Sequence, residues 1–284
     1  MDWHSLLLTP GTFEAVLLLI SVVAGILGAI LGLGGGVVIV PALTLLFKVN
    51  IRYAVGASIV SVIATSSGAA AVYVREHMTN IRVAMFLEVA TTLGALGGAI
   101  ATGYLSTRFL FLLFAAIMFY SAYAMTRPRT SEGAAEPDRW AQRLKLDSSY
   151  PDALLGRDVF YHVTGVPLAF VLMLGAGAIS ALLGVGSGAL KVPAMDRAMK
   201  LPIKVSSATS NFMIGVTAAA SAGAYYMRGE ILPFLAAPVA LGVLIGASLG
   251  TKLMVRLPNQ KIRRAFLVVI LIIGVEMAMK GLGT

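Results

Sequence analysis

The fold is decided by the stretch LGLGGGVVIVPA at residues 31–42, which returns as LGVGSGALKVPA at residues 183–194. Over residues 24–42, ten of nineteen positions are identical to those 152 residues later. Each glycine cluster interrupts a long apolar run. The apolar segment after each cluster has about 11 residues, or roughly 17 Å as helix, which is short for a membrane crossing. The sequence therefore predicts a duplicated unit with a glycine-broken helix in each copy.

The same offset of 152 residues relates pairs outside the glycine clusters, so the whole second half repeats the first. Repeats of this kind are typical of secondary transporters. Glycines at four-residue spacing in both halves indicate close helix packing. The matched pairs include Ser58 and Ser210, Thr65 and Thr217, Tyr73 and Tyr225, Gly94 and Gly246, and Gly98 and Gly250.

The composition of the 284 residues excludes a soluble globule, because 58% are hydrophobic and only 12% are charged. A mean hydropathy of +0.88 agrees with a chain surrounded largely by lipid. The net charge of +9 comes from Lys and Arg in short patches between apolar runs, which argues against a nucleic-acid partner. There is no cysteine, and the three histidines fit no ligand spacing. We predict no metal site and no cofactor.

Eight apolar runs approach the roughly 20 residues that a spanning helix needs, and they predict an all-α integral membrane protein. The expected domains are a first transmembrane repeat at 1–126, a charged connecting segment at 127–158 and a second repeat at 159–284. In the connecting segment, Pro137-Asp138 can start a short interfacial helix, although a disordered connector explains the composition equally well. The eight runs are Phe13–Leu33, Ala54–Val74, Val83–Leu105, Phe109–Met125, His162–Leu183, Val205–Met227, Leu232–Leu253 and Ala265–Met279.

Charge favours one of two topologies. If each glycine cluster merely interrupts one crossing, each repeat crosses four times, the repeats are parallel and Lys and Arg divide evenly. If the short segments Val37–Phe47 and Ala189–Met199 make their own passage, each repeat crosses five times and the repeats are inverted. In that arrangement 16 of the 22 Lys and Arg gather on one side. The positive-inside rule favours inverted repeats with both termini external and glycine breaks near the midplane.

The glycine breaks are the first candidate site. Glycine permits left-handed backbone, and unpaired backbone groups at membrane depth must be buried in protein or line a wet cavity. A helix resuming after the break aims its N-terminal N–H groups and dipole at an anion. Tight packing of small residues is the alternative. The candidate residues are Gly34, Gly35 and Gly36 in the first break and Gly186, Ser187 and Gly188 in the second.

Polar side chains in the apolar runs complete the candidate site. Lys191 follows the second break where the first half has Ile39, and it either serves the substrate or snorkels to an interface. Glu88 is the coupling candidate, because it either carries a proton or pairs with a lysine; a position near an interface is the alternative. Hydroxyls and amides could coordinate an oxyanion, although bonds to carbonyls one helical turn away explain about half of them. The selected residues are Ser58, Thr209, Ser210 and Asn211.

The doubled motif at Gly32–Ala42 and Gly184–Ala194, with the run ATSNFMIG at 208–215, resembles the TauE/SafE (DUF81-type) family of sulfite and organosulfonate exporters. The resemblance covers nearly the whole chain. It implies a membrane permease that moves small sulfur-containing anions such as sulfite, sulfoacetate or sulfolactate. Ser187 interrupts a cluster that is commonly all glycine in the family, and Gly56-Ala57-Ser58 replaces the usual Gly-Thr-Ser.

The sequence therefore predicts a secondary transporter, an exporter of small sulfur-containing anions, that works by alternating access in the plasma membrane. The expected partners are a small anionic substrate and the lipid bilayer, with a homodimer left open. The alternatives are a channel or transporter for another small anion or a cation, and an intramembrane enzyme. An enzyme would need a catalytic constellation and a cation channel an acidic ring, and neither is found in the sequence.

Overall fold

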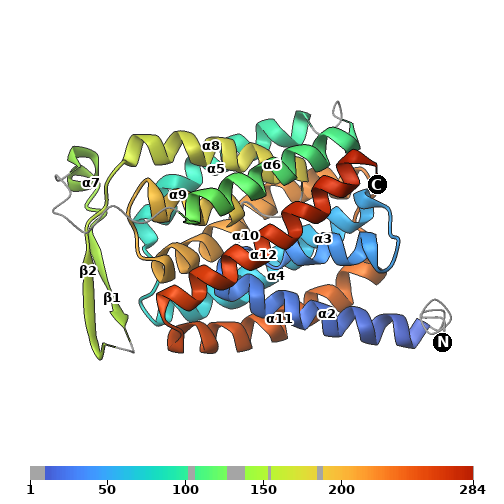
Figure 1. The fold of residues 1–284 in the computed structure, drawn as a ribbon, viewed down its shortest axis with the longest axis horizontal. Coiled ribbons are helices and arrows are strands. Elements are labelled where there is room, and N and C mark those ends of the chain that lie inside the picture. The colour runs from blue at the N-terminus through green and yellow to red at the C-terminus, as the bar shows by residue number, and fades with distance from the viewer. Residues whose placement is uncertain (1–9, 102–105, 127–137, 153–154, 184–187, 284) are drawn as a thin grey trace.

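The computed structural model describes residues 10–101, 106–126, 138–152, 155–183 and 188–283. These residues form a bundle of helices with one two-stranded hairpin at its end (Figure 1). The predicted class, an all-α membrane protein, is confirmed. The long and short helices of the bundle are α2 (Pro10–Leu31), α3 (Gly36–Leu45), α4 (Ile51–Arg75), α5 (Ile81–Ala101), α6 (Thr107–Thr126), α8 (Val166–Leu183), α9 (Gly188–Arg197), α10 (Ile203–Met227), α11 (Pro233–Arg256) and α12 (Asn259–Leu282).

Each apolar run predicted from the sequence coincides with one helix, and the two short segments coincide with α3 and α9. Within the described residues, five helices are long and apolar enough to cross a membrane, namely α2, α4, α5, α11 and α12. Helix α10 has 25 residues, as many as α4, but its first half is rich in serine, threonine and asparagine. It is also buried along much of its length, so it contributes polar groups to the interior of the bundle.

Two closely packed helix pairs flank the centre of the bundle: α2 packs on α11, and α5 packs on α8. Side chains added at Gly246 and Gly250 of α11 would collide with the backbone of α2. Side chains at Gly94 and Gly98 of α5 would likewise collide with the backbone of α8. The glycines therefore allow close helix approach, as their four-residue spacing indicated. Helices α4 and α10 pack together in the interior, and α6 packs on α12.

The structure describes residues 138–152 and 155–158 of the connecting segment, and residues 127–137 lie outside the described residues. The connecting segment contains the short helix α7 (Arg139–Arg143), capped by the Asp138 carboxylate, which accepts a hydrogen bond from Trp140 N. An antiparallel hairpin of β1 (Ser148–Asp152) and β2 (Arg157–Tyr161) follows, and the sequence analysis did not predict it. The domain boundary placed between residues 158 and 159 falls inside β2.

The hairpin is anchored to the helices by buried polar contacts. Asn80, which caps α5, donates from Nδ2 to the Tyr161 hydroxyl at 3.0 Å and to the Leu146 carbonyl at 2.8 Å. Burial raises the pKa of the Tyr161 phenol, so the hydroxyl stays neutral at this contact. Lys204 at the start of α10 lies 3.4 Å from Asp152 of β1, and both side chains are buried. The connecting segment is therefore fixed to the ends of α5 and α10.

Candidate functional site

The first glycine break is a reversal of the chain. Gly32, Gly34 and Gly35 adopt φ values of 70°, 76° and 68°, which side-chain-bearing residues rarely adopt. Helix α3 then runs back along α2, because the Phe13 and Phe47 rings meet with centroids 4.9 Å apart. The first break therefore lies at the closed end of a helical pair that is buried in the bundle.

Helices α8 and α9, which precede and follow the second break, form the same kind of helical pair. Thr164 N, just before α8, donates to the Met199 carbonyl, just after α9, at 3.2 Å, so α9 runs back along α8. Gly186 and Ser187 of the predicted site lie outside the described residues. Gly188 begins α9, and a side chain there would collide with the Gly32 carbonyl. The start of α9 therefore lies against the first break inside the bundle.

Two of the predicted polar residues lie against the first break. Ser210 Oγ of α10 donates to the Gly32 carbonyl at 2.8 Å, and Asn211 Nδ2 donates to the Ala29 carbonyl at 2.7 Å. These side chains donate hydrogen bonds to carbonyls at the C-terminal end of α2, where no further helical N–H groups are available to pair with them. Thr209 points elsewhere, because its Oγ1 accepts a hydrogen bond from Asn80 N at 3.1 Å. Ser58 of α4 is completely buried.

Tyrosines support the ends of the helices that precede the breaks. Tyr73 donates its hydroxyl to the Ala29 carbonyl at 3.0 Å, and Tyr225 donates to the Ala181 carbonyl at 2.8 Å. Donors and acceptors are both separated by 152 residues, so the same contact is made in each half. The sequence analysis matched the two tyrosines to each other but assigned them no role.

Three buried polar atoms of α10 have no hydrogen-bond partner among the described residues: Ser206 Oγ, Ser207 Oγ and Asn211 Oδ1. Ser207 is next to the first break, since a side chain on Gly32 would come within 2.8 Å of its Cα. Buried polar groups are normally paired, and an unpaired one costs about 1–3 kcal/mol. Ser207 and Asn211 therefore present hydrogen-bonding atoms beside the first break that the described residues do not use.

The two charged residues predicted separately form one buried cluster. Lys191 of α9 is fully enclosed, and its Nζ lies 3.4 Å from Glu88 Oε2 of α5. Lys191 Nζ also donates to Thr217 Oγ1 of α10 at 2.7 Å, and Thr217 Oγ1 in turn donates to Glu88 Oε1 at 2.6 Å. Lys191 therefore does not extend to a membrane interface. Glu88 is paired with a lysine, which was one of the alternatives derived from the sequence.

Thr217 was part of the polar pattern in α10 but was not selected as a site residue. Its Oγ1 also lies 3.2 Å from the Met213 carbonyl, so its single proton has two acceptors within reach. Thr92, one turn after Glu88, adds a hydroxyl 3.3 Å from Glu88 Oε1. The Thr92 contact is local to α5, whereas the Thr217 contact forms only when the helices pack together, because Thr217 is 129 residues from Glu88 in sequence.

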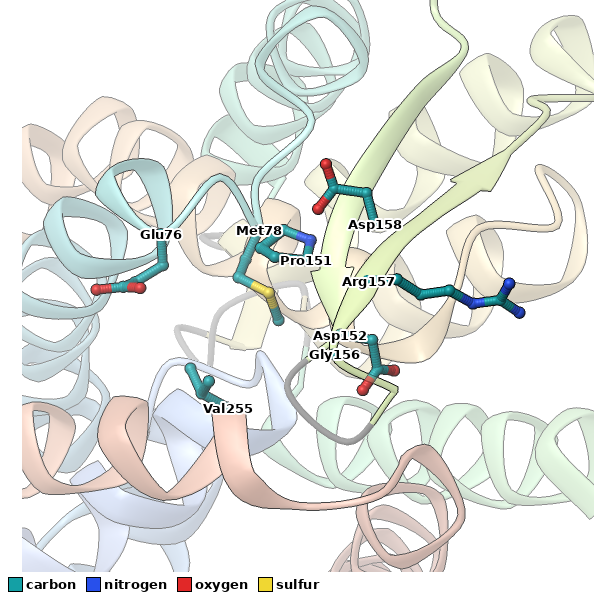
Figure 2. Close-up of a pocket in the computed structure, with 8 residues that line it drawn as sticks. All are labelled: Glu76, Met78, Pro151, Asp152, Gly156, Arg157, Asp158 and Val255. Carbon is teal, nitrogen blue, oxygen red and sulfur yellow. The ribbon is translucent and has the colours of Figure 1, made fainter.

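A separate cavity of about 290 Å³ lies at the hairpin end of the bundle. Figure 2 shows Glu76, Met78 and Val255 on the helical side, with hairpin residues Pro151, Asp152, Arg157 and Asp158 opposite. Three carboxylates and one guanidinium line it, which makes it unfavourable for an anion. None of the predicted site residues lines this cavity. The described residues also contain no group of three His, Cys, Asp or Glu that could hold a metal ion.

The chain is similar to membrane transporters along most of its length. It is 25% identical over 275 residues to "Probable membrane transporter protein YunE" of Bacillus subtilis, covering 94% of this chain and 98% of that protein. It is 23% identical to "Probable membrane transporter protein YdhB" of the same bacterium, covering 88% and 94%. "Probable membrane transporter protein MJ0441" of Methanocaldococcus jannaschii is also 23% identical, covering 92% and 90%. No solved structure matches the chain.

These relatives identify the chain as a multi-pass membrane transporter and not as an enzyme. The family described as "Sulfite exporter TauE/SafE" matches residues 17–277, which is most of the sequence. The resemblance seen in the doubled glycine motif is therefore confirmed, and the chain belongs to the TauE/SafE family.

Proposed function

We propose that this transporter exports small sulfur-containing anions, such as sulfite or organosulfonates, across the plasma membrane by alternating access. The family and its relatives support transport, and the charge and geometry of the central site support an anion as cargo. The observation that carries the proposal is the ammonium of Lys191, which is fully enclosed on α9, three residues after the Gly188 that lies against the first break. A cation at membrane depth is costly and typically marks a substrate or ion pathway.

The arrangement of the two helical pairs supports inverted repeats. Near the end of α12, Lys280 Nζ donates to Thr44 Oγ1 at the end of α3, at 2.6 Å. Near the start of α12, Arg263 Nη2 lies 2.8 Å from each carboxylate oxygen of Asp196 at the end of α9. Helix α12 has 24 residues, about 36 Å, so α3 and α9 end on opposite ends of the bundle. The two pairs thus enter from opposite sides, as inverted repeats require.

The charges support the same orientation relative to the membrane. The start of α2 and the end of α12 lie at one end of the bundle, and α7 and the hairpin lie at the other (Figure 1). The hairpin end carries the excess of Lys and Arg counted from the sequence. By the positive-inside rule, the hairpin end faces the cytoplasm and both termini face outward.

The proposed substrate site combines three kinds of group. The ten-residue helices α3 and α9 present their N-terminal dipoles at the breaks. The hydroxyls of α10 next to Gly32 supply neutral hydrogen-bond donors, and Lys191 supplies the charge. A cation channel is less well supported, because Glu88, the carboxylate of this cluster, is already paired with Lys191.

The test is flux through the purified protein in liposomes, measured separately with radiolabelled sulfite and with methanesulfonate. We expect saturable flux of at least one of these anions. Lys191→Met keeps much of the side-chain volume and removes the charge, so the apparent affinity should fall by about tenfold or more. Lys252→Met is the matched control, because Lys252 is exposed on α11 and should not affect affinity.

Absence of flux for both anions through folded protein would contradict the proposed substrate class. Unchanged affinity in Lys191→Met would instead leave an anion site formed by helix termini and hydroxyls alone. The lysine would then have no role in binding.

A further inference from the structure

We infer that Glu88 and the transported anion are alternative partners of Lys191, so that each anion is carried together with one proton bound to Glu88. This inference rests on the proposed function and adds the coupling ion. It starts from the geometry of the empty protein, in which Glu88 Oε2 lies 3.4 Å from the enclosed Lys191 ammonium. Glu88 thus acts as a tethered counter-anion in the place where a cargo anion would meet the same charge.

The need for charge balance supplies the first argument. A buried ion requires a partner, because desolvation costs several kcal/mol per ion in a protein interior. In the empty carrier, Lys191 and Glu88 neutralise each other. A monovalent anion entering beside an ionised Glu88 would leave one uncompensated negative charge in the bundle. If Glu88 takes up a proton, Lys191 pairs with the cargo and the loaded site is neutral again.

The second argument is that the hydrogen bonds among Glu88, Thr217 and Lys191 can be completed whether the Glu88 side chain is ionised or protonated. With the carboxylate ionised, Thr217 Oγ1 donates to Glu88 Oε1 at 2.6 Å. With the carboxyl protonated, the proton lies on Oε1 and is donated to Thr217 Oγ1. The Thr217 proton then turns to the Met213 carbonyl, 3.2 Å away. A hydroxyl can accept two hydrogen bonds and donate one, so it keeps its bond from Lys191 throughout.

Access to the cluster supplies the third argument. The Glu88 side chain retains 10% exposure, whereas Lys191 has none, so the carboxylate is the more accessible member of the pair. Lys191 has three N–H donors, and the described residues supply acceptors for two of them, Glu88 and Thr217. No other charged side chain contacts Glu88 from α5, α9 or α10 among the described residues, and α8, which packs along α5, contains no charged residue.

A consequence follows for the energetics of transport. Because the empty and loaded sites are both neutral for a monovalent cargo, neither conformational change moves net charge across the membrane. The direction of net flux is then set by the anion gradient together with the pH gradient, and export requires the anion gradient to exceed the opposing proton gradient.

The test uses methanesulfonate, which is permanently ionised and carries no proton of its own. Liposomes containing the intact protein and a trapped pH-sensitive dye are diluted into methanesulfonate, with the membrane potential clamped by valinomycin and potassium. We expect the lumen to acidify with about one proton per anion, and the flux to be independent of the clamped potential. Because each bound anion requires one bound proton, the apparent affinity should fall as the pH rises, by at most about tenfold per pH unit.

Glu88→Gln separates coupling from transport, because the amide resembles the protonated carboxyl and cannot titrate. We expect it to carry methanesulfonate without acidifying the lumen, with pH-independent affinity and with a flux that now follows the membrane potential. Glu230→Gln is the matched control, since Glu230 is also buried and lies beside cations, Arg52 and Arg228, but between α10 and α11. It should retain proton coupling.

The outcomes are distinguishable from failure of the proposed function. Sulfonate flux without proton flux in the unaltered protein would overturn the inference, as would full proton coupling in Glu88→Gln. If neither sulfonate nor protons move through folded protein, the proposed substrate class fails and the coupling inference fails with it. Thr217→Ser should retain coupling, because the hydroxyl that receives the Glu88 proton is kept, whereas Thr217→Val should weaken it.

Discussion

The helical pair of α2 with α3 and the pair of α8 with α9 fold the chain back in the same way around different side chains. At the matching position, the first pair has Ile39 and the second has Lys191, and both side chains are completely buried. Ile39 packs in an apolar cluster with Leu17 and Leu43, whereas Lys191 contacts Glu88 and Thr217. The chain reversal is thus common to both helical pairs, whereas the buried charge is present only in the second pair.

The partner positions differ in the same way. The residue 152 positions after Glu88 is Ala240, so both members of the ion pair have apolar counterparts in the other half. Thr65, the counterpart of Thr217, donates to the Ser61 carbonyl one turn earlier at 2.8 Å. Because one half of the bundle folds with apolar residues at these places, the ion pair is not required by the fold. A buried ion pair is weak evidence for stability, and its presence here supports a functional role.

The largest expected effect comes from replacing Lys191 and Glu88 by the apolar residue types found at the matching positions of the other half. Lys191→Ile alone leaves Glu88 buried without its partner and should lower the free energy of unfolding by about 3 kcal/mol. Adding Glu88→Ala should recover most of that stability, because both positions are then apolar. Both variants should transport anions with an apparent affinity lower by about tenfold or more, as expected for Lys191→Met. Thermal unfolding in detergent and flux in liposomes measure the two properties. Recovery of the original affinity in the double variant would show that the ion pair is dispensable.

A smaller effect is expected from a substitution in the first glycine break. Gly34→Val places a branched side chain at a φ of 76°, within 3.2 Å of Ile214 and Val62 side-chain atoms. Left-handed backbone costs a residue with a side chain about 1–2 kcal/mol, and the branched side chain adds strain. We expect the folded variant to lose transport.

Gly175→Ala in α8 is the control, because nothing lies within 4 Å of the added methyl group. It should transport normally and be slightly more stable, since alanine favours a helix over glycine. Normal transport by well-folded Gly34→Val would show that the break serves packing alone.

The smallest effect compares the tyrosines that support the two helix ends. Tyr225→Phe should cost about 1–2 kcal/mol of stability, because the described residues offer the Ala181 carbonyl no other side-chain donor. Tyr73→Phe should cost less, because Asn211 Nδ2 still donates to the Ala29 carbonyl. Chemical denaturation in mixed micelles can rank the two variants. Equal losses would indicate that Asn211 does not compensate for the missing hydroxyl.

Much of the fold follows from patterns that depend on local sequence. Apolar runs of membrane length predicted the helices, and the glycine clusters predicted where α2 ends and α3 begins. The hairpin was missed because its five-residue strands mix charged, aromatic and proline residues without a clear alternation. Its strands are fixed instead by contacts with Asn80 and Lys204, which lie far away in sequence.

The candidate site could be predicted residue by residue but not as an arrangement. Lys191 and Glu88 were each conspicuous as charges in apolar runs, but they are 103 residues apart, and only the packing of α5 and α9 on α10 brings them together. Thr209 and Ser210 are adjacent in sequence, and the helical rotation between them directs one to Asn80 and the other to Gly32. The direction of a side chain on a buried helix depends on its neighbours, which periodicity alone does not identify.

The central claim is that the two helical pairs enter the membrane from opposite sides, with the hairpin in the cytoplasm. Single cysteines in this cysteine-free chain test it directly, at Ser148→Cys in the exposed part of β1 and at Met227→Cys, where the side chain is 89% exposed at the other end of the bundle. In intact cells, a membrane-impermeant maleimide should label the Met227→Cys variant promptly and the Ser148→Cys variant only after permeabilisation. Prompt labelling of Ser148→Cys in intact cells would contradict the claim.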